Sequence, residues 1–181
     1  MVNGIVSHLD WAPTLLAVSG VPDIKEKLLK GHKAGDKKFK VHLDGYNMLD
    51  YFKSGGVSAG PRQEIFYFTD IGEMAAVRHN DIKVHYMIQE AHGFDVWKNP
   101  YTPLGWPSMM NLRADPFERA MHESIGWAGW TTQRMYALSA AAVISTNFIK
   151  TFLDYPQRQQ PGNFNVEAII KQLEAARATG Q

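Results

Sequence analysis

Two histidine–aspartate pairs have residue types and spacing that suggest metal chemistry. His8 and Asp10 stand two positions apart, and so do His42 and Asp44. Side chains two apart on an extended strand point the same way, so each pair could offer two ligands to one metal ion. The local sequence explains both aspartates without a metal, because Asp10 opens a helical pattern and Asp44 precedes a turn glycine. We therefore favour structural roles, and a small metalloprotein remains an alternative hypothesis.

Two further histidines and a group of aromatic residues suggest a binding site. His85 lies in a strand pattern, and His92 follows it in an irregular connection expected at 91–107. The histidines could bind a ligand or move a proton, although the sequence places no carboxylate beside them. The aromatic residues could form a wall for a sugar or aryl group, but we favour core packing and loop anchoring. They are Phe94, Trp97, Tyr101, Trp106, Trp127 and Trp130.

Composition excludes several classes of chemistry. The sequence has no cysteine, so disulfides, zinc–thiolate sites and cysteine nucleophiles are excluded. It has no Gly-x-Ser-x-Gly elbow, no dinucleotide-binding glycine motif and no phosphate loop. The residues themselves therefore identify no catalytic group and no metal ligand set.

Charge and hydropathy give no sign of a nucleic-acid or membrane partner. The formal net charge is +1, and the lysine-rich stretch 23–40 is interpreted as a solvated insertion because its charge is local. No signal peptide is evident at the start, and no apolar run reaches the roughly 20 residues that a membrane span needs. We expect a soluble protein whose compartment the sequence leaves open.

Four short strands are expected to position the histidines. Strand patterns rich in Phe, Tyr, Ile and Val are separated by polar turns, which is typical of an antiparallel meander. In the third of these, Val84 and Tyr86 face one side, whereas Lys83 and His85 face the other. The expected strands occupy 64–68, 74–78, 82–88 and 109–112.

Helices are expected before and after this sheet in the sequence. The pattern predicts a capped, largely buried helix at 10–19, a short helix at 24–30 and a longer helix at 133–154. A last helix is expected from Asn165. The predicted fold class is α+β: a small four-stranded antiparallel sheet packed against C-terminal helices and preceded by a helix-and-loop segment. Four charged residues should form a local network of ion pairs and caps after the last strand: Arg113, Asp115, Glu118 and Arg119.

Five segments, in this order, resemble the C-terminal portion of bacterial arylsulfatases of the alkaline-phosphatase-like superfamily. The most specific are a D-x-x-P-T-L helix start at Asp10, an R-x-x-x-x-K pattern from Arg78 to Lys83, and an N-L-x-x-D-P-x-E pattern that ends at Glu118. The resemblance covers essentially all 181 residues. The segments are IVSHLDWAPTLLAVSGVP, HLDGYNMLDYF, PRQEIFYF, AAVRHNDIKVH and NLRADPFERA.

The resemblance implies a division of the chain and a missing catalytic centre. Residues 1–60 would be the end segment of the sulfatase catalytic α/β domain, and 61–181 would be the C-terminal subdomain. The family hydrolyses sulfate esters with a formylglycine made in C/S-x-P-x-R and with a calcium ion held by Asp and Asn residues. This sequence lacks that motif and those ligands. The chain should therefore hold no cofactor of its own and be inactive alone.

The resemblance also implies substrate-lining residues and partners. Some arylsulfatases place a histidine near the substrate in the loop after the third strand, which His92 matches. His85 precedes it on the strand, and Trp97 would wall the pocket. The expected partner is the rest of a catalytic domain, or a second copy, bound through the apolar surface around Trp11–Val18. Parent enzymes are periplasmic or cytoplasmic. The alternative is a non-enzymatic binding module that uses the tryptophan-rich loop 94–106.

Overall fold

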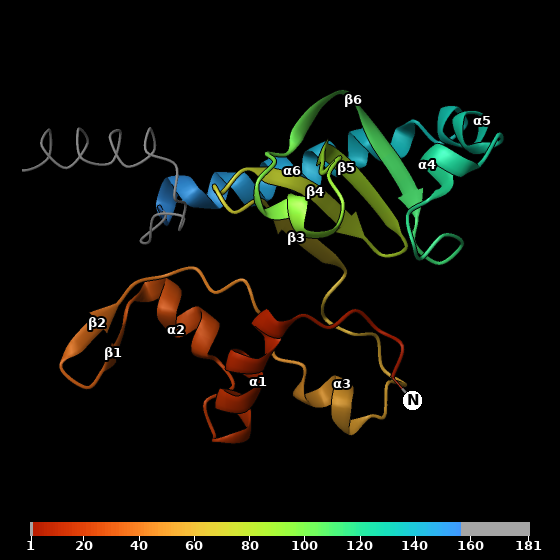
Figure 1. Ribbon diagram of the computed structural model, residues 1–181. Helices are drawn as coiled ribbons and strands as arrows, with labels where there is room; N and C mark the ends of the chain where they lie inside the picture. Colours follow the sequence, from red (N-terminus) through yellow and green to blue (C-terminus); the bar gives the residue numbers. More distant parts are fainter. Residues whose placement is uncertain (1, 157–181) are drawn as a thin grey trace, which may run out of the picture.

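The protein folds into two lobes joined by a narrow waist (Figure 1). The computed structural model describes residues 2–156. The lower lobe in Figure 1 is formed by the first part of the chain, and the upper lobe holds the main sheet and the long helix α6. The helix expected from Asn165 lies outside the described residues.

The main sheet has four antiparallel strands in the order β3-β4-β5-β6, which confirms the predicted fold class. Short polar turns join the first three, and Ala76 pairs with His85 across the centre. One boundary was wrong. The last strand begins at Thr102, because the chain after a short 3-10 helix returns to pair with β5. The strands are β3 Glu64–Phe68, β4 Met74–His79, β5 Ile82–Ile88 and β6 Thr102–Asn111, and the 3-10 helix is Gly93–Trp97.

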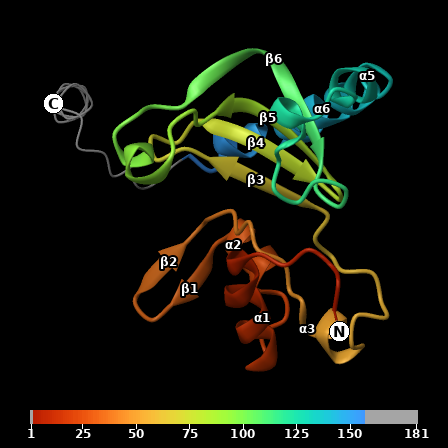
Figure 2. The ribbon, with the colours of Figure 1, turned by 45° about the vertical axis from the view of Figure 1, so that its right-hand side comes forward.

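The core of the upper lobe lies between this sheet and α6, which spans Tyr136–Asp154 (Figure 2). Phe66 of β3 stacks on Phe148 of α6 with ring centroids 3.9 Å apart. Val84 and Met109 fill the centre with Ala141. By length and composition alone, α6 could cross a membrane. In this structure its inner face packs on the sheet.

Two short helices, α4 Ala120–Glu123 and α5 Trp127–Thr132, connect β6 to α6. The indole nitrogen of Trp127 donates a hydrogen bond to the carbonyl of Met109 at 3.0 Å. Trp130 packs against the core cluster. These two tryptophans therefore have the packing role that the sequence predicted.

The lower lobe contains more regular structure than the sequence indicated. The stretch 23–40, predicted as a solvated insertion with a short helix, holds that helix and also an antiparallel hairpin of two short strands. The helix predicted at 10–19 begins with a 3-10 turn that Ser7, not Asp10, caps. The elements are the 3-10 turn His8–Asp10, α1 Trp11–Val18, α2 Ile24–Lys30, β1 His32–Ala34, β2 Lys37–Phe39 and α3 Leu49–Lys53.

Helix α1 is not largely buried, contrary to the prediction. Leu15 is 61% exposed and Val18 is 64% exposed, and Trp11 is also exposed. Helical spacing of apolar residues predicts a surface that needs a partner, but it does not identify the partner. Within the described residues, only Pro13, Thr14 and Ala17 of this helix are buried.

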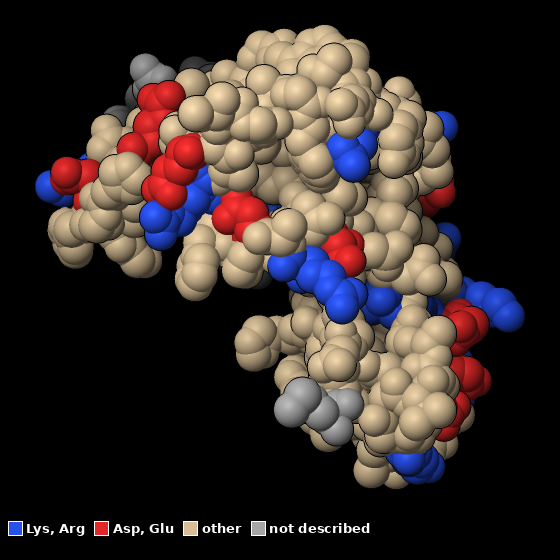
Figure 3. All heavy atoms as spheres, turned by 90° about the vertical axis from the view of Figure 1, so that its right-hand side faces the viewer, with Lys and Arg blue, Asp and Glu red and all other residues tan. Residues whose placement is uncertain are grey.

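The waist between the lobes carries much of the charge visible on one face of the molecule. Figure 3 shows Lys, Arg, Asp and Glu atoms where the outline narrows, and a further group of charged atoms on the left of the upper lobe. Gly45 lies at this waist, and a Cβ there would collide with the carbonyl oxygen of Leu9. The glycine that the sequence explained as a turn residue is thus required by close contact between backbones.

Candidate functional site

A buried ion pair joins the two lobes. Arg62, just before β3, binds the carboxylate of Asp10 with Nη2–Oδ1 at 2.6 Å and Nε–Oδ2 at 2.8 Å. The two side chains are 3% and 2% exposed. Burial opposes ionisation of Asp10, but hydrogen bonds from Arg62 and from the backbone N–H groups of Tyr46 and Ser7 lower the pKa of this carboxyl. Asp10 therefore remains a charged tie between segments distant in sequence.

The histidine–aspartate pairs do not converge on a metal site. Asp10 is occupied by Arg62, while His42 Nδ1 and Asp44 Oδ1 hydrogen-bond to each other at 2.7 Å. Among residues 2–156, no group of three or more His, Asp or Glu side chains could hold a metal ion. The alternative hypothesis of a small metalloprotein therefore has no geometric support in the described chain.

The structure brings His85 and His92 into one pocket in the upper lobe, which we call the distal pocket. Its volume is about 550 Å³, within the size range of small-molecule sites. Strand β5 and its C-terminal extension supply one wall, and the turn after β6 supplies the other. Trp97, the third predicted site residue, is absent from the lining and is 83% exposed. The polar lining residues are Tyr67, Lys83, His85, Gln89, Glu90, His92, Tyr101, Glu118 and His122.

Glu118 organises the charged part of the distal pocket. Its Oε2 lies 2.6 Å from His85 Nε2, and its Oε1 accepts a hydrogen bond from Lys83 Nζ at 2.7 Å. The hydrogen bond from His85 and the contact with Lys83 lower the pKa of Glu118 to about 2, against the opposing effect of burial. Glu118 has a φ of 56°, a left-handed conformation that non-glycine residues rarely adopt.

Sequence reasoning missed this carboxylate as a partner of His85. It assigned Glu118 to a local network with its neighbours, and part of that network exists: Asp115 accepts a hydrogen bond from the N–H of Ala120, and Arg119 pairs with Glu123. Glu118 itself reaches across to β5. The alternation that put Lys83 and His85 on one strand face was the available signal, but it did not reveal what faces them.

The distal pocket can bind and orient a polar ligand. A carboxylate bound to one imidazole nitrogen fixes the ring orientation of His85, as in many acid–base pairs. His92 and Tyr101 add further polar side chains to the lining. These groups suit recognition and proton exchange with a bound molecule.

The tryptophan-rich loop 94–106, which we call the aromatic loop, is not anchored by burial of its aromatic side chains as the sequence predicted. Phe94, Trp97 and Trp106 are all well exposed, whereas Tyr101 lines the distal pocket. Their aromatic character predicted burial, but these three rings remain largely exposed, including that of Trp106 within β6. The part of the loop nearest the distal pocket is therefore available for contact with another molecule.

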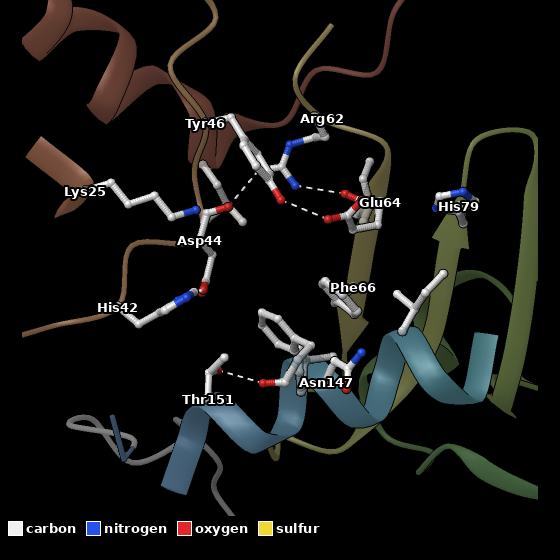
Figure 4. Close-up of a pocket in the computed structure, with 15 residues that line it drawn as sticks. Lys25, His42, Asp44, Tyr46, Arg62, Glu64, Phe66, His79, Asn147 and Thr151 are labelled. Carbon is white, nitrogen blue, oxygen red and sulfur yellow. Dashed lines mark hydrogen bonds and ion pairs between the residues drawn. The ribbon is translucent and has the colours of Figure 1, made fainter. Parts of the chain in front are cut away.

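A second hollow lies between the lobes, and we call it the waist cleft (Figure 4). Its volume is about 560 Å³. It is lined by His42 and Asp44, which form one of the histidine–aspartate pairs, and by Arg62, which forms the buried ion pair with Asp10. Residues of β3 and α6 complete the lining. No pattern in the sequence indicated that these segments would meet.

Comparison with solved structures finds a sulfatase fold. The chain superposes on the crystal structure of PsFucS1 sulfatase from Pseudoalteromonas sp. with a TM-score of 0.63 and 19% sequence identity. The fold resembles part of a sulfatase. The match covers 87% of this chain but only 28% of that sulfatase chain. No protein-family model matches the sequence, and a search of curated proteins finds no match.

Proposed function

We propose that this chain forms the C-terminal subdomain of a sulfatase and lines the substrate pocket of the complete enzyme. The single observation that supports this is the match of 87% of the chain to 28% of a sulfatase, at a TM-score of 0.63. Residues 1–60 would end the catalytic domain, and 61–181 would form the supporting subdomain. Activity would require the formylglycine and the calcium ion of the larger part, so this chain alone would not hydrolyse sulfate esters.

The apolar face of α1 is the proposed contact with the rest of the enzyme. Trp11, Leu15 and Leu16 are exposed on this helix. Exposed apolar clusters on a folded domain mark interaction surfaces. The sulfatase match leaves 72% of that enzyme outside the aligned part, since 28% is covered, which offers a partner large enough to bury this face.

The distal pocket is the proposed contribution to the substrate site. His92 would face the leaving group of the sulfate ester, with His85 behind it, fixed by Glu118 at 2.6 Å. Trp97 would complete the wall from outside the pocket, where its exposed ring can meet an aryl or sugar group. An ordered histidine near the ester oxygen can bind it or donate a proton to it.

The test is reconstitution of activity. The reading frame around this chain should be examined for C/S-x-P-x-R, and the segment that carries this motif should be expressed and mixed with the purified chain. We expect calcium-dependent hydrolysis of 4-nitrophenyl sulfate only in the mixture. Hydrolysis by the purified chain alone, or failure of the mixture while a covalent fusion of the two parts is also inactive, would overturn the proposal.

Paired variants localise the contact. Leu15→Asp places a charge on the apolar face and should abolish activity of the mixture. Ile125→Asp is the matched control, because Ile125 is fully exposed in the upper lobe, and it should leave the activity of the mixture unchanged. Equal loss in both variants would contradict the assigned surface.

A second candidate function is a non-enzymatic binding module that uses the loop 94–106. The exposure of Phe94 and Trp97 favours it, since aromatic side chains combine large contact area with few rotamers. Titration of the chain with a glycan panel should then change tryptophan fluorescence in the wild type but not in Trp97→Ala. No change in wild-type fluorescence across the panel would exclude this candidate.

A further inference from the structure

The waist cleft has the form of a binding site for a small molecule. Six segments contribute to it: the 3-10 turn His8–Asp10, α2, the extended segment before α3, β3 with Arg62 just before it, the end of β4, and α6. Its volume of about 560 Å³ lies within the usual range for ligand pockets. The buried Asp10–Arg62 pair lies directly behind it and fixes the two lobes relative to each other. The walls are therefore held in place before any ligand arrives.

The floor of the cleft is aromatic. The rings of Phe66 and Phe148 stack with centroids 3.9 Å apart and an angle of 13° between their planes. Ile65, Phe68 and Ile144 surround them. Such a surface favours the apolar face of a ligand, because ring faces carry partial negative charge and attract weakly positive C–H groups.

The rim of the cleft carries polar atoms with unused hydrogen-bonding capacity. Glu64 Oε1 accepts a hydrogen bond from the Tyr46 hydroxyl at 2.8 Å. The second carboxylate oxygen of Glu64 has no hydrogen bond within residues 2–156. In the same part of the chain, Lys25 Nζ lies 4.5 Å from the Tyr46 ring centroid without an ion pair, and the Asn147 amide forms no hydrogen bond. Figure 4 shows Lys25, Glu64 and Asn147 on three different sides of the same space.

The charges around the cleft nearly cancel. Arg62 is neutralised by Asp10, and the remaining lining holds one cation, Lys25, and the carboxylates of Asp44 and Glu64. A strongly anionic ligand would meet these two carboxylates, and a cationic ligand would compete with Lys25. Interleaved donors and acceptors around an apolar floor instead match a neutral ring that carries several hydroxyl groups.

We propose that the waist cleft binds a neutral saccharide ring. The apolar face of the ring packs against the part of the stacked Phe66–Phe148 pair that the two rings do not cover on each other, and its hydroxyls bond to Glu64, Lys25 and Asn147. This site is separate from the distal pocket and performs no catalysis. It would hold a neutral unit of a glycan, and it does not depend on whether the chain belongs to a sulfatase.

The test is titration of the full chain with methyl glycosides of neutral hexoses and 6-deoxyhexoses, followed by backbone amide chemical shifts. We expect saturable binding with shifts centred on β3 and α6. Phe148→Ala should raise the Kd about tenfold or more, and a tenfold change in Kd corresponds to about 1.4 kcal/mol of binding free energy. Glu64→Gln and Asn147→Ala should each weaken it several-fold, and these two rim variants remain informative if Phe148→Ala is unfolded by thermal melting. Ile125→Ala is the control, because Ile125 is fully exposed and does not line the cleft, and it should bind as the wild type does.

Three outcomes would overturn the proposal. The first is the absence of saturable binding by every glycoside tested. The second is unchanged affinity in both rim variants. The third is tighter binding of a sulfated or amino-substituted sugar than of its neutral parent. Loss of affinity in Trp97→Ala with unchanged affinity in the rim variants would move the sugar site to the loop.

Discussion

Asp10 and Glu118 are two carboxylates held by cationic partners, and they differ in what surrounds them. Asp10 and Arg62 are almost fully buried at the waist, where two backbone N–H groups complete the set of donors. Glu118 is 28% exposed and borders the distal pocket, where it contacts Lys83 and His85. The first carboxylate ties two lobes together, and the second faces a space that a ligand can enter.

The difference in burial determines what each group can do. A buried charge must keep its partner, because removal of either one leaves an uncompensated charge in a poorly solvated place. A partly exposed carboxylate can exchange partners with water or with a ligand at smaller cost. We therefore expect variants at the waist to change folding, and variants at the distal pocket to change pH dependence and binding.

The largest effect is expected for Arg62→Ala. It leaves Asp10 buried without its cation and should lower the free energy of unfolding by about 3–5 kcal/mol. Urea denaturation followed by circular dichroism measures this loss. Lys27→Ala is the control, because the Lys27–Asp23 pair is solvent-exposed and should contribute far less to stability than the buried pair. Equal losses in the two variants would contradict the distinction between buried and exposed pairs.

Gly45→Ala tests the close contact between the backbones of Gly45 and Leu9, next to the Asp10–Arg62 ion pair. The added Cβ meets the carbonyl oxygen of Leu9, so the backbone must shift. We expect a loss of about 1–3 kcal/mol in the free energy of unfolding, measured by the same denaturation. Gly105→Ala is the matched control, since nothing lies within 4 Å of a Cβ there. A Gly45→Ala protein as stable as this control would show that the waist is not closely packed.

A smaller, pH-dependent effect is expected for Glu118→Gln. The pKa of Glu118 is lowered in the fold from 4.5 to about 2, so its contacts with Lys83 and His85 contribute stability above about pH 4.5, and this contribution is lost as the pH falls toward 2. The wild type should exceed Glu118→Gln by about 1–2 kcal/mol at pH 7, with the difference shrinking between pH 4.5 and 2. Denaturation across this pH range measures it, and a difference that does not change with pH would contradict the assigned pairing.

The smallest effect is expected for Trp97→Ala. The ring is 83% exposed, so the free energy of unfolding should change by no more than about 0.5 kcal/mol. Thermal melting measures this change. A clear loss of stability would mean that the aromatic loop packs against the fold after all, and would restore the anchoring role that the sequence favoured.

Local patterns predicted much of the fold. Three of the four strands were placed nearly correctly, because β-branched and aromatic runs between polar turns depend on neighbours in sequence. The long helix was also predicted, and its apolar spacing matches the buried face that carries Ala141, Ser145 and Phe148. The first half of β6 was missed, since Gly105 and the two prolines in that strand disfavour a strand and only pairing with β5 stabilises it.

The candidate site was only partly predictable. Alternation along β5 placed Lys83 and His85 on one face, and the following connection placed His92 near them. Glu118 could not be assigned to that face, because its position depends on a turn with φ of 56° beyond β6. Exposure of Leu15 and Trp97 also could not be predicted, since helical or aromatic patterning records a tendency to bury and not the availability of a partner.

The sequence by itself determined the α+β class, the meander, the absence of cysteine chemistry and the order of segments that resembles a sulfatase. These features follow from composition and from interactions between close neighbours. Only the tertiary structure decided that Asp10 binds Arg62 rather than a metal, that Glu118 fixes His85, and that a cleft opens at the waist. Each of these brings together residues more than 30 positions apart, and such meetings depend on how whole elements pack.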